Sequence, residues 1–480
     1  MTKRPGRTAL VHFLSQAVVS IAGFAATFAI AYLLGAEGLG RYSIAVALGF
    51  FWLSIPLNAV GMAIKKRMSE GTDPAGFLSA GITINGVLAI LLALLVLGAG
   101  RVLEGVTAGG EFVRVITSLD VEIAALLVCS AAYVTAIQAL HGQQRVGTAG
   151  VMNAVERLGR SGIQVFLLLV GSGVAAITFG FAGSLAATAV LVFVLAGVRP
   201  VRPGVEHVRE LLSYARYAWM STLRGRVFGW LDTIVLSFFV GASLIGIYEA
   251  AWGIASLLAV ASGSISQTLF PEVSELSTRE NYDRIKHFLD EALAFSGIFI
   301  IPGLFGAAAL GDRVLTFYRP EFGRGTGVLL VLVAAYIADV YASQLLNVLN
   351  AIDRPDRAFR VNTLFIGLNA VLNVALIWTI GWYGAALATA LSSSLRAVAG
   401  YRAVTDIVGA ISVPGRTIGM EVAAAAVMGA LVYPVVPLVP HTRLGTVVLV
   451  SFGAVVYAVC LLGLSTRVRG KARSLAPVSP

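Results

Sequence analysis

Charged side chains within two apolar stretches are the residues of this chain best suited to bind a charged ligand. An ionisable group at membrane depth is costly and is therefore a candidate for function. Arginine suits a phosphate because its planar group can donate to two oxygens at once. The candidate binding residues are Arg157, Arg160, Arg224, Arg226 and Asp232. Their types favour an anionic, phosphate-bearing ligand; the alternative is that these groups pair between helices and hold the structure together.

Helical spacing indicates which of these arginines have a local partner and which can face the same cavity. Glu156 and Arg160 are four residues apart with the acid first, so they can pair along one face of a helix. This pairing leaves Arg157 without a local partner. Arg224 and Arg226 are about 200° apart on a helix, so only one of the two can face a given cavity. The spacing alone does not decide which one does.

Acidic and basic residues outside these arginines are also candidates. Asp232 shares a helical face with Gly229, and we therefore expect it to face protein. The remaining isolated candidates are Glu249, Asp339 and Arg396.

The apolar stretches that carry these residues are long enough to cross a bilayer. Of all residues, 58% are hydrophobic and 12% are charged, about half the charge of a soluble domain. A span needs roughly 20 apolar residues, and we predict an all-α polytopic membrane protein with about 14 spans. The predicted spans are 11–34, 42–63, 76–99, 120–140, 148–171, 174–197, 215–240, 247–270, 289–310, 327–349, 359–380, 382–403, 418–438 and 444–464.

The loops between these spans differ in charge. Alternate segments, including both termini, hold roughly three times as many lysines and arginines as the others, which predicts cytosolic termini in a cytoplasmic (plasma) membrane. The net charge of +10 is explained by this bias, so we expect no nucleic acid partner. The largest cytosolic loop, 271–288, is predicted to be a solvated connector; the alternative is a short surface helix capped by Ser277 and Glu280.

Cysteine and histidine patterns contain no metal or disulfide signature. Cys129 and Cys460 lie far apart within apolar stretches, and the five histidines lack metal-ligand spacing. We expect no cofactor and no metal.

The chain contains an internal repeat. Residues 32–47 align with residues 238–253 at an offset of 206, and residues 183–189 align with residues 384–390 at an offset of 201. A repeat of six spans returns the chain to the same side, so the halves share one orientation. We predict a six-helix lobe in residues 1–205, a second in 206–410, and two extra helices with a cytosolic tail in 411–480.

Four segments resemble a known family. Residues 13–45, 231–241, 247–276 and 368–392 resemble the polysaccharide-biosynthesis flippases of the multidrug/oligosaccharidyl-lipid/polysaccharide exporter superfamily. The resemblance implies a MATE-like fold of two lobes that moves a polyprenyl- or dolichyl-phosphate-linked sugar across the membrane by alternating access. It places Asp232 at an acidic position of the seventh helix, whereas the preceding arginines are not part of the family's pattern.

Two other functions stay open. A MATE-type multidrug/cation antiporter needs an intramembrane carboxylate, commonly in the first helix, and residues 11–34 contain none. A membrane-embedded enzyme that acts on lipid-linked sugars needs an organised acid or base, and the loop with Glu104 and Glu111 has none. We therefore expect a transporter and not an enzyme. Its expected partners are the lipid-linked sugar, membrane lipids and glycosyltransferases of the same pathway, and we expect a monomer.

Overall fold

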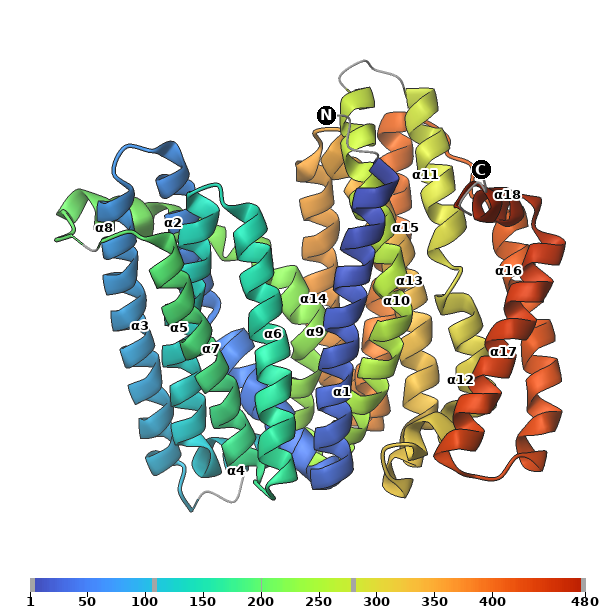
Figure 1. Cartoon of the computed structure of the whole chain (residues 1–480), viewed down its shortest axis with the longest axis horizontal. Coiled ribbons are helices and arrows are strands. Elements are labelled where there is room, and N and C mark those ends of the chain that lie inside the picture. Colours follow the sequence, from blue (N-terminus) through green and yellow to red (C-terminus); the bar gives the residue numbers. More distant parts are fainter. Residues whose placement is uncertain (1–4, 106–109, 200, 278–281, 476–480) are drawn as a thin grey trace. The chain divides into compact units, whose positions relative to one another are not determined.

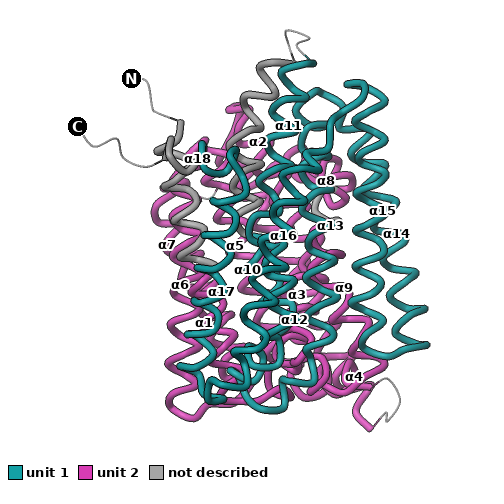
Figure 2. The backbone as a smooth tube through the Cα atoms, turned by 90° about the vertical axis from the view of Figure 1, so that its right-hand side faces the viewer, with its two compact units in different colours: residues 1–17, 250–480 teal, residues 18–249 magenta. Residues whose placement is uncertain are grey.

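The structure is a computed structural model. The residues that it describes form helices joined by short connections. It describes residues 5–105, 110–199, 201–277 and 282–475; the side chains of residues 5–20, 221, 222, 224, 260–277 and 471–475 are outside this description. By their internal contacts, residues 18–249 form one compact unit (unit 2), and residues 250–480 with the first residues of α1 form another (unit 1). Figure 2 shows the two units in different colours.

Unit 2 is built around α5, which packs against α2, α3 and α7. Figure 1 shows long helices of this unit running side by side. Its elements are α1 (Pro5–Val46), the π-helix η1 (Ala47–Trp52), α2 (Ile55–Glu70), α3 (Pro74–Val102), α4 (Gly110–Ser118), α5 (Asp120–Gly142), α6 (Val146–Leu169), α7 (Val174–Ala196), α8 (Val205–Ala218), α9 (Met220–Phe239) and the start of α10 (Ala242–Ser277).

Unit 1 has α13 in the corresponding central place, in contact with α11, α12, α14 and α15. The last two long helices, α16 and α17, pack against each other and against α12. The elements of unit 1 after α10 are α11 (Tyr282–Ser296), α12 (Ile300–Thr316), the 3₁₀-helix η2 (Pro320–Gly325), α13 (Thr326–Ala351), α14 (Pro355–Ile380), α15 (Tyr383–Val408), α16 (Gly415–Val432), the 3₁₀-helix η3 (Tyr433–Leu438), α17 (Arg443–Leu464) and α18 (Thr466–Leu475).

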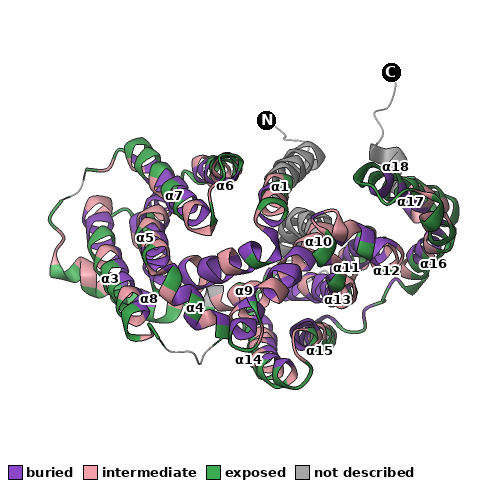
Figure 3. Cartoon of the chain, turned by 90° about the horizontal axis from the view of Figure 1, so that it is seen from below, coloured by how far each residue is buried: buried purple, intermediate pink, exposed green. Residues whose placement is uncertain are grey.

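The predicted membrane spans are confirmed as helices. All fourteen predicted ranges lie in helical parts of the structure, but four of them, 42–63, 215–240, 289–310 and 418–438, each run from one helix into the next. Ten segments of the described chain meet the length and hydropathy needed to cross a bilayer. Large apolar side chains are exposed along α3, where Leu94 and Leu95 are about 60% exposed, and Figure 3 shows similarly exposed faces on α16 and α17. Exposed apolar bands of this kind face lipid. The fold is therefore an all-α polytopic membrane fold.

The loop predicted at 271–288 is mostly helical. Helix α10 continues to Ser277, and α11 begins at Tyr282, so the prediction of a solvated connector is wrong for these residues. The proposed cap at Glu280 lies outside the described residues.

The repeat is visible in the positions of the helices. Helix α3 begins at Pro74 and α11 at Tyr282, 208 residues later. Helix α5 begins at Asp120 and α13 at Thr326, 206 residues later. The second sequence match is wrong, because Gly183 is the tenth residue of α7 whereas the aligned glycine is the second residue of α15. The lobe boundaries at 205 and 410 stay a prediction.

The first sequence match has a structural cause. Helix α1 breaks at Gly35, where φ is 75° and ψ is −176°, and the chain between α9 and α10 breaks at Val240, which is extended. After each break a small residue and a glycine are spaced four apart, a pattern that lets two helices approach closely. Here the two repeated segments pack against each other within unit 2.

The contact between these repeated segments is symmetric. A Cβ atom on Gly40 would lie 1.9 Å from the carbonyl oxygen of Ala242, and a Cβ atom on Gly246 would lie 1.9 Å from the carbonyl oxygen of Ala36. Each glycine is thus required by the backbone of the other repeat. The match between residues 32–47 and 238–253 therefore reflects two surfaces that contact each other.

A buried ion pair connects three helices of unit 1. Arg396 of α15 donates from Nη1 to Oδ1 of Asp339 on α13 at 2.5 Å and from Nε to Asn362 on α14 at 3.1 Å. The arginine is 3% exposed and the aspartate is 8% exposed. These two isolated candidates of the sequence analysis are therefore partners.

We predict that Gly40→Ala and Gly246→Ala each lower the thermal unfolding temperature of the purified protein. The added methyl group meets a backbone oxygen and forces the helices apart, which costs about 1–3 kcal/mol. Gly23→Ala on α1 is the control, since no atom lies within 4 Å of its Cβ position. If all three variants unfold at the same temperature, the close contact does not exist.

We predict that Arg396→Ala destabilises the protein by about 3–5 kcal/mol, because it leaves the Asp339 carboxylate buried without its cation. Arg354→Ala is the matched control: its partner Asp356 is 3.2 Å away, and the two side chains are 40% and 49% exposed. An exposed pair of this kind contributes about 1 kcal/mol or less. Equal losses of unfolding free energy in the two variants would contradict the prediction.

Candidate functional site

The second membrane span of unit 2 is interrupted by the π-helix η1. The amide of Leu53 donates to the carbonyl of Leu48 at 2.9 Å, a bond across five residues. Pro56 in the first turn of α2 has no amide hydrogen to continue the α-helical ladder. Carbonyl groups at this junction are therefore available to side chains from other helices.

Arg226 of α9 binds these carbonyls. Its Nη1 atom donates to the carbonyl of Phe50 at 3.2 Å and to that of Phe51 at 2.5 Å, and its guanidinium lies 5.1 Å from the centre of the Phe51 ring. Trp230, one turn further along α9, stacks on Phe51 at 4.0 Å, and its carbonyl accepts a bond from Trp52. Helix α9 is thus joined to η1 by an arginine and two tryptophans.

Arg160 of α6 contacts a third phenylalanine, which adjoins the aromatic residues of η1. Its guanidinium is 4.2 Å from the centre of the Phe181 ring on α7, and Phe181 lies 4.9 Å from Phe50. As the spacing predicted, Glu156 pairs with Arg160, with 3.6 Å between Nε and Oε1. The Ser184 hydroxyl donates to the same carboxylate oxygen at 3.0 Å.

These contacts bring two predicted residues into one site. We call Arg160, Phe181, Phe50, Phe51 and Arg226 the arginine–aromatic cluster; its members come from α6, α7, η1 and α9 of unit 2. Of the two arginines on α9, the one in the cluster is Arg226. Both of its described hydrogen bonds leave from Nη1, so Nε and Nη2 keep donors with no acceptor recorded among the described residues.

The other predicted residues are not part of this cluster. Arg157 is exposed on α6, and the side chain of Arg224 lies outside the described residues. Asp232 is 3% exposed and accepts a hydrogen bond from Tyr248 of α10. One residue further along both helices, Thr233 donates to Glu249. These acidic residues therefore connect α9 to the start of α10.

Sequence reasoning missed the aromatic half of the cluster. Phe50, Phe51 and Phe181 resemble ordinary lipid-facing residues in a membrane segment, and no spacing rule joins residues 50 and 181. Pro56, which follows the two phenylalanines, was the available signal for an irregular helix at that point. Among the described residues, no three histidine, cysteine or acidic side chains are placed to hold a metal ion.

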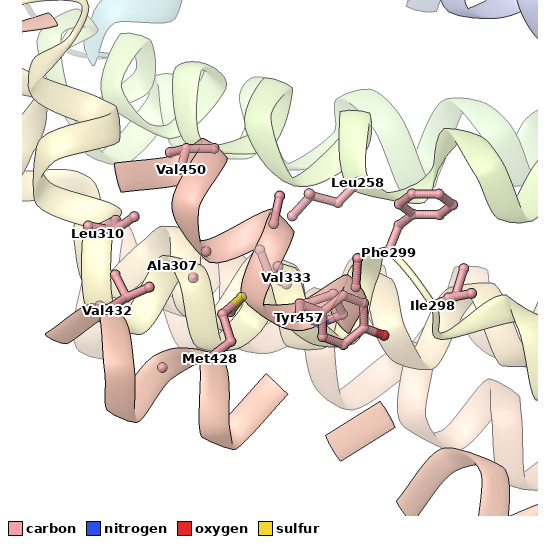
Figure 4. A pocket seen from close by; sticks show the side chains of 18 of the residues that line it. Leu258, Ile298, Phe299, Ala307, Leu310, Val333, Met428, Val432, Val450 and Tyr457 are labelled. Carbon is pink, nitrogen blue, oxygen red and sulfur yellow. The ribbon is translucent and has the colours of Figure 1, made fainter. Parts of the chain in front are cut away.

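An apolar pocket of about 550 Å³ lies within unit 1. Figure 4 shows that its lining is almost entirely hydrocarbon, with the hydroxyl of Tyr457 as a polar exception among the labelled residues. The lining comes from α10, α12, α13, α16, α17 and α18 and from the segment between α11 and α12, and it includes Leu258, Gly306 and Met428. The pocket suits a flexible apolar chain and offers little to a polar ligand.

The chain is similar to known flippases. Residues 6–277 match the family described as polysaccharide biosynthesis protein, and residues 149–457 match the family described as lipid II flippase MurJ. The probable flippase AglR of Haloferax volcanii is 29% identical over 477 residues, 98% of each chain. The probable low-salt glycan biosynthesis flippase Agl15 of the same organism is 26% identical over 367 residues, 76% of each chain.

Solved structures share the fold. The inward closed conformation of the lipid II flippase MurJ superposes with a TM-score of 0.78 at 17% identity, over 94% of this chain and 98% of that one. An inward-facing multidrug resistance MATE family transporter superposes with a TM-score of 0.66 at 12% identity, over 82% and 98%. The predicted MATE-like fold is thus confirmed. Because the first family match spans more than half of the sequence, the chain belongs to the polysaccharide biosynthesis protein family.

Proposed function

We propose that this protein translocates a polyprenyl- or dolichyl-phosphate-linked sugar or oligosaccharide from the cytosolic to the outer leaflet, for cell-surface polysaccharide or glycoprotein synthesis. Membership of the polysaccharide biosynthesis protein family supports this function, as do the relatives named as probable flippases. The observation that carries it is the arginine–aromatic cluster, which places two cations of unit 2 against a chain of three phenylalanine rings in contact. The protein acts by transport and changes no covalent bond of its cargo.

The cluster supplies the chemistry that a phosphate-linked sugar needs. Arginine donates to phosphate oxygens through its planar fork, and the unused Nε and Nη2 donors of Arg226 are available for such contacts. Aromatic faces pack against the apolar side of a sugar or an isoprenoid chain. Arg157 and Arg224 remain predicted cargo contacts, and Asp232 remains a predicted site residue.

The apolar pocket of unit 1 suits the other part of the same substrate. A polyprenyl chain is flexible and wholly apolar, which matches a lining in which Tyr457 supplies the polar hydroxyl. We infer that the pocket holds isoprene units of the cargo.

Transport follows the membrane potential. With both termini in the cytosol and the protein in the cytoplasmic membrane, the cargo enters from the cytosolic leaflet. Rocking of the protein between two open states exposes the sugar outside. Outward movement of one anionic charge through an inside-negative potential releases about 2.3 kcal/mol per 100 mV. Enzymes that consume the sugar outside, such as glycosyltransferases of the same pathway, add further drive, and the carrier works as a monomer.

We predict that Arg160→Gln and Arg226→Gln each slow flipping by about tenfold or more. Each change removes a charge-assisted hydrogen bond worth about 1.5–3 kcal/mol, which corresponds to a factor of roughly 10–100. The measurement is the movement of a fluorescent polyprenyl-phosphate sugar across reconstituted vesicles, with a membrane-impermeant quencher added outside. Arg226→Lys, which keeps the charge but lacks the planar fork, should fall between the glutamine variant and the unchanged protein.

Arg41→Gln is the matched control for this experiment. It removes the same charge from unit 2 at an exposed i,i+4 pair with Glu37, with 2.9 Å between the atoms. Unfolding temperatures of all variants show whether a slow variant is also unfolded. Unchanged flipping by the Arg160/Arg226 double variant would exclude the cluster as the anion site. Exchange of a cationic drug without movement of the labelled lipid would favour the MATE-type antiporter.

We predict that Gly306→Leu weakens transport of long-chain cargo more than that of a short-chain analogue. No atom lies within 4 Å of the Cβ position of Gly306, so the leucine side chain occupies the pocket. Excluding about two methylene groups from the pocket costs roughly 1.6 kcal/mol, about a tenfold loss of affinity. Gly367→Leu on α14 is the control, because its Cβ position is equally open and lies outside the pocket. Equal effects on both chain lengths would contradict this role of the pocket.

A further inference from the structure

The ninth predicted span contains a helix break that the repeat does not require. Helix α11 ends at Ser296 and α12 begins at Ile300, whereas the equivalent α3 continues unbroken through the corresponding turn. Gly297 lies at the break. A Cβ atom on Gly297 would be 2.5 Å from Oε2 of Glu421 and 2.7 Å from Oη of Tyr341. The break therefore brings the backbone against two polar side chains from α16 and α13.

Glu421 has no recorded partner for its charge. The residue is fully buried, and neither carboxylate oxygen has a hydrogen-bond partner among the described residues. The buried hydroxyls of Tyr341 and of Tyr457 on α17 likewise have no recorded partner there. Both tyrosines are close enough to Glu421 to interact with it electrostatically. Three helices thus direct oxygen-bearing side chains to one buried place.

Three charged groups on the neighbouring helices α11 and α12 are bound to other partners. On α12, Arg313 donates to three carbonyls of η3 and the following loop at 2.7–3.1 Å, and Asp312 lies 3.7 Å from His441. On α11, Asp290 pairs with Arg467 at 2.7 Å. Within the described residues, no lysine, arginine or histidine forms an ion pair with the α16 carboxylate.

A lone carboxylate in such surroundings requires a positive charge from outside the chain. Burying an unpaired ionised carboxylate costs several kcal/mol, and a bound positive ion removes this cost. Carboxylate and hydroxyl oxygens are ligands suited to small hard cations. We propose that Glu421, together with the hydroxyls of Tyr341 and Tyr457, binds one small monovalent cation, which is a proton or Na⁺.

The cation site adjoins the apolar pocket, which gives the site a role in transport. This role rests on the proposed function. Tyr457 belongs both to the site and to the lining of the apolar pocket, where Figure 4 shows it with Ile298 and Phe299. A cation that orders Tyr457 thereby changes the wall of the pocket. Occupation of the cation site and binding of the isoprenoid chain are then coupled through one side chain. Glu421 and Tyr457 belong to α16 and α17, the two long helices that follow the repeat.

The test measures thermal unfolding of the full-length protein in lipid nanodiscs, without any transport substrate. In one arm, Na⁺ replaces N-methylglucamine at constant pH and ionic strength. In the other, pH is varied without Na⁺. A cation that binds the folded form raises its unfolding temperature, so the protein should gain about 2 °C or more with Na⁺, or on acidification. Glu421→Gln, which is neutral and of the same shape, should lose that response.

Glu104→Gln is the matched control, since it removes an exposed carboxylate and should keep the response. A response to Na⁺ that only Glu421→Gln loses identifies Na⁺, and a loss confined to the pH arm identifies the proton. If the glutamine variant follows the unchanged protein in both arms, the proposal is wrong. If Glu421→Gln fails to fold, Tyr457→Phe provides the test. Loss of this hydroxyl oxygen should raise the cation concentration needed to stabilise the protein about tenfold or more. If that concentration is unchanged, the proposed site is wrong.

This experiment is independent of flipping. A protein that binds the cation but does not move lipid-linked sugars would leave the site intact and overturn the proposed function. A protein that flips its cargo without a Glu421-dependent cation response would overturn the site alone.

Discussion

A bilayer offers no water to a buried polar group, and the polar contacts of this protein follow from that constraint. Carbonyls at the π-helix η1 accept from Arg226, and the buried carboxylate of Asp339 is bound by Arg396. In both cases a guanidinium joins helices that are distant in sequence. The same constraint makes Glu421 conspicuous, because its two oxygens are buried without a recorded partner.

The close packing of the two repeated segments depends on a few small residues. The small residues at 36, 40, 242 and 246 allow two repeated segments to contact each other through their backbones. Larger side chains at these positions would separate the helices that carry Tyr42 and Tyr248. These equivalent tyrosines then bind different partners, Gln164 and Asp232. The two repeated segments therefore share one backbone contact but differ in the polar partners of their tyrosines.

In the function that we propose, the arginine–aromatic cluster and the apolar pocket suit different parts of an amphiphilic cargo. The cluster lies in unit 2 and combines cations with aromatic faces, whereas the pocket lies in unit 1 and is almost entirely hydrocarbon. A lipid-linked sugar contains an anionic group and a long apolar chain in one molecule. A protein that moves such a molecule needs a surface for each part. Arginine and aromatic side chains form the first surface here, and aliphatic side chains form the second.

The sequence by itself determined the long helices and the first of the two repeat matches, because hydropathy and small-residue spacing are local properties of the chain. It also determined the Glu156–Arg160 pair, since one helical turn sets that distance. Only the tertiary structure decided that Arg226 joins Arg160 through three phenylalanines, that Asp339 and Arg396 are partners, and that Glu421 meets Gly297. The Arg396–Asp339 and Arg226–Phe50 contacts join residues 57 and 176 positions apart, and no local period can encode which distant helix packs against a given face.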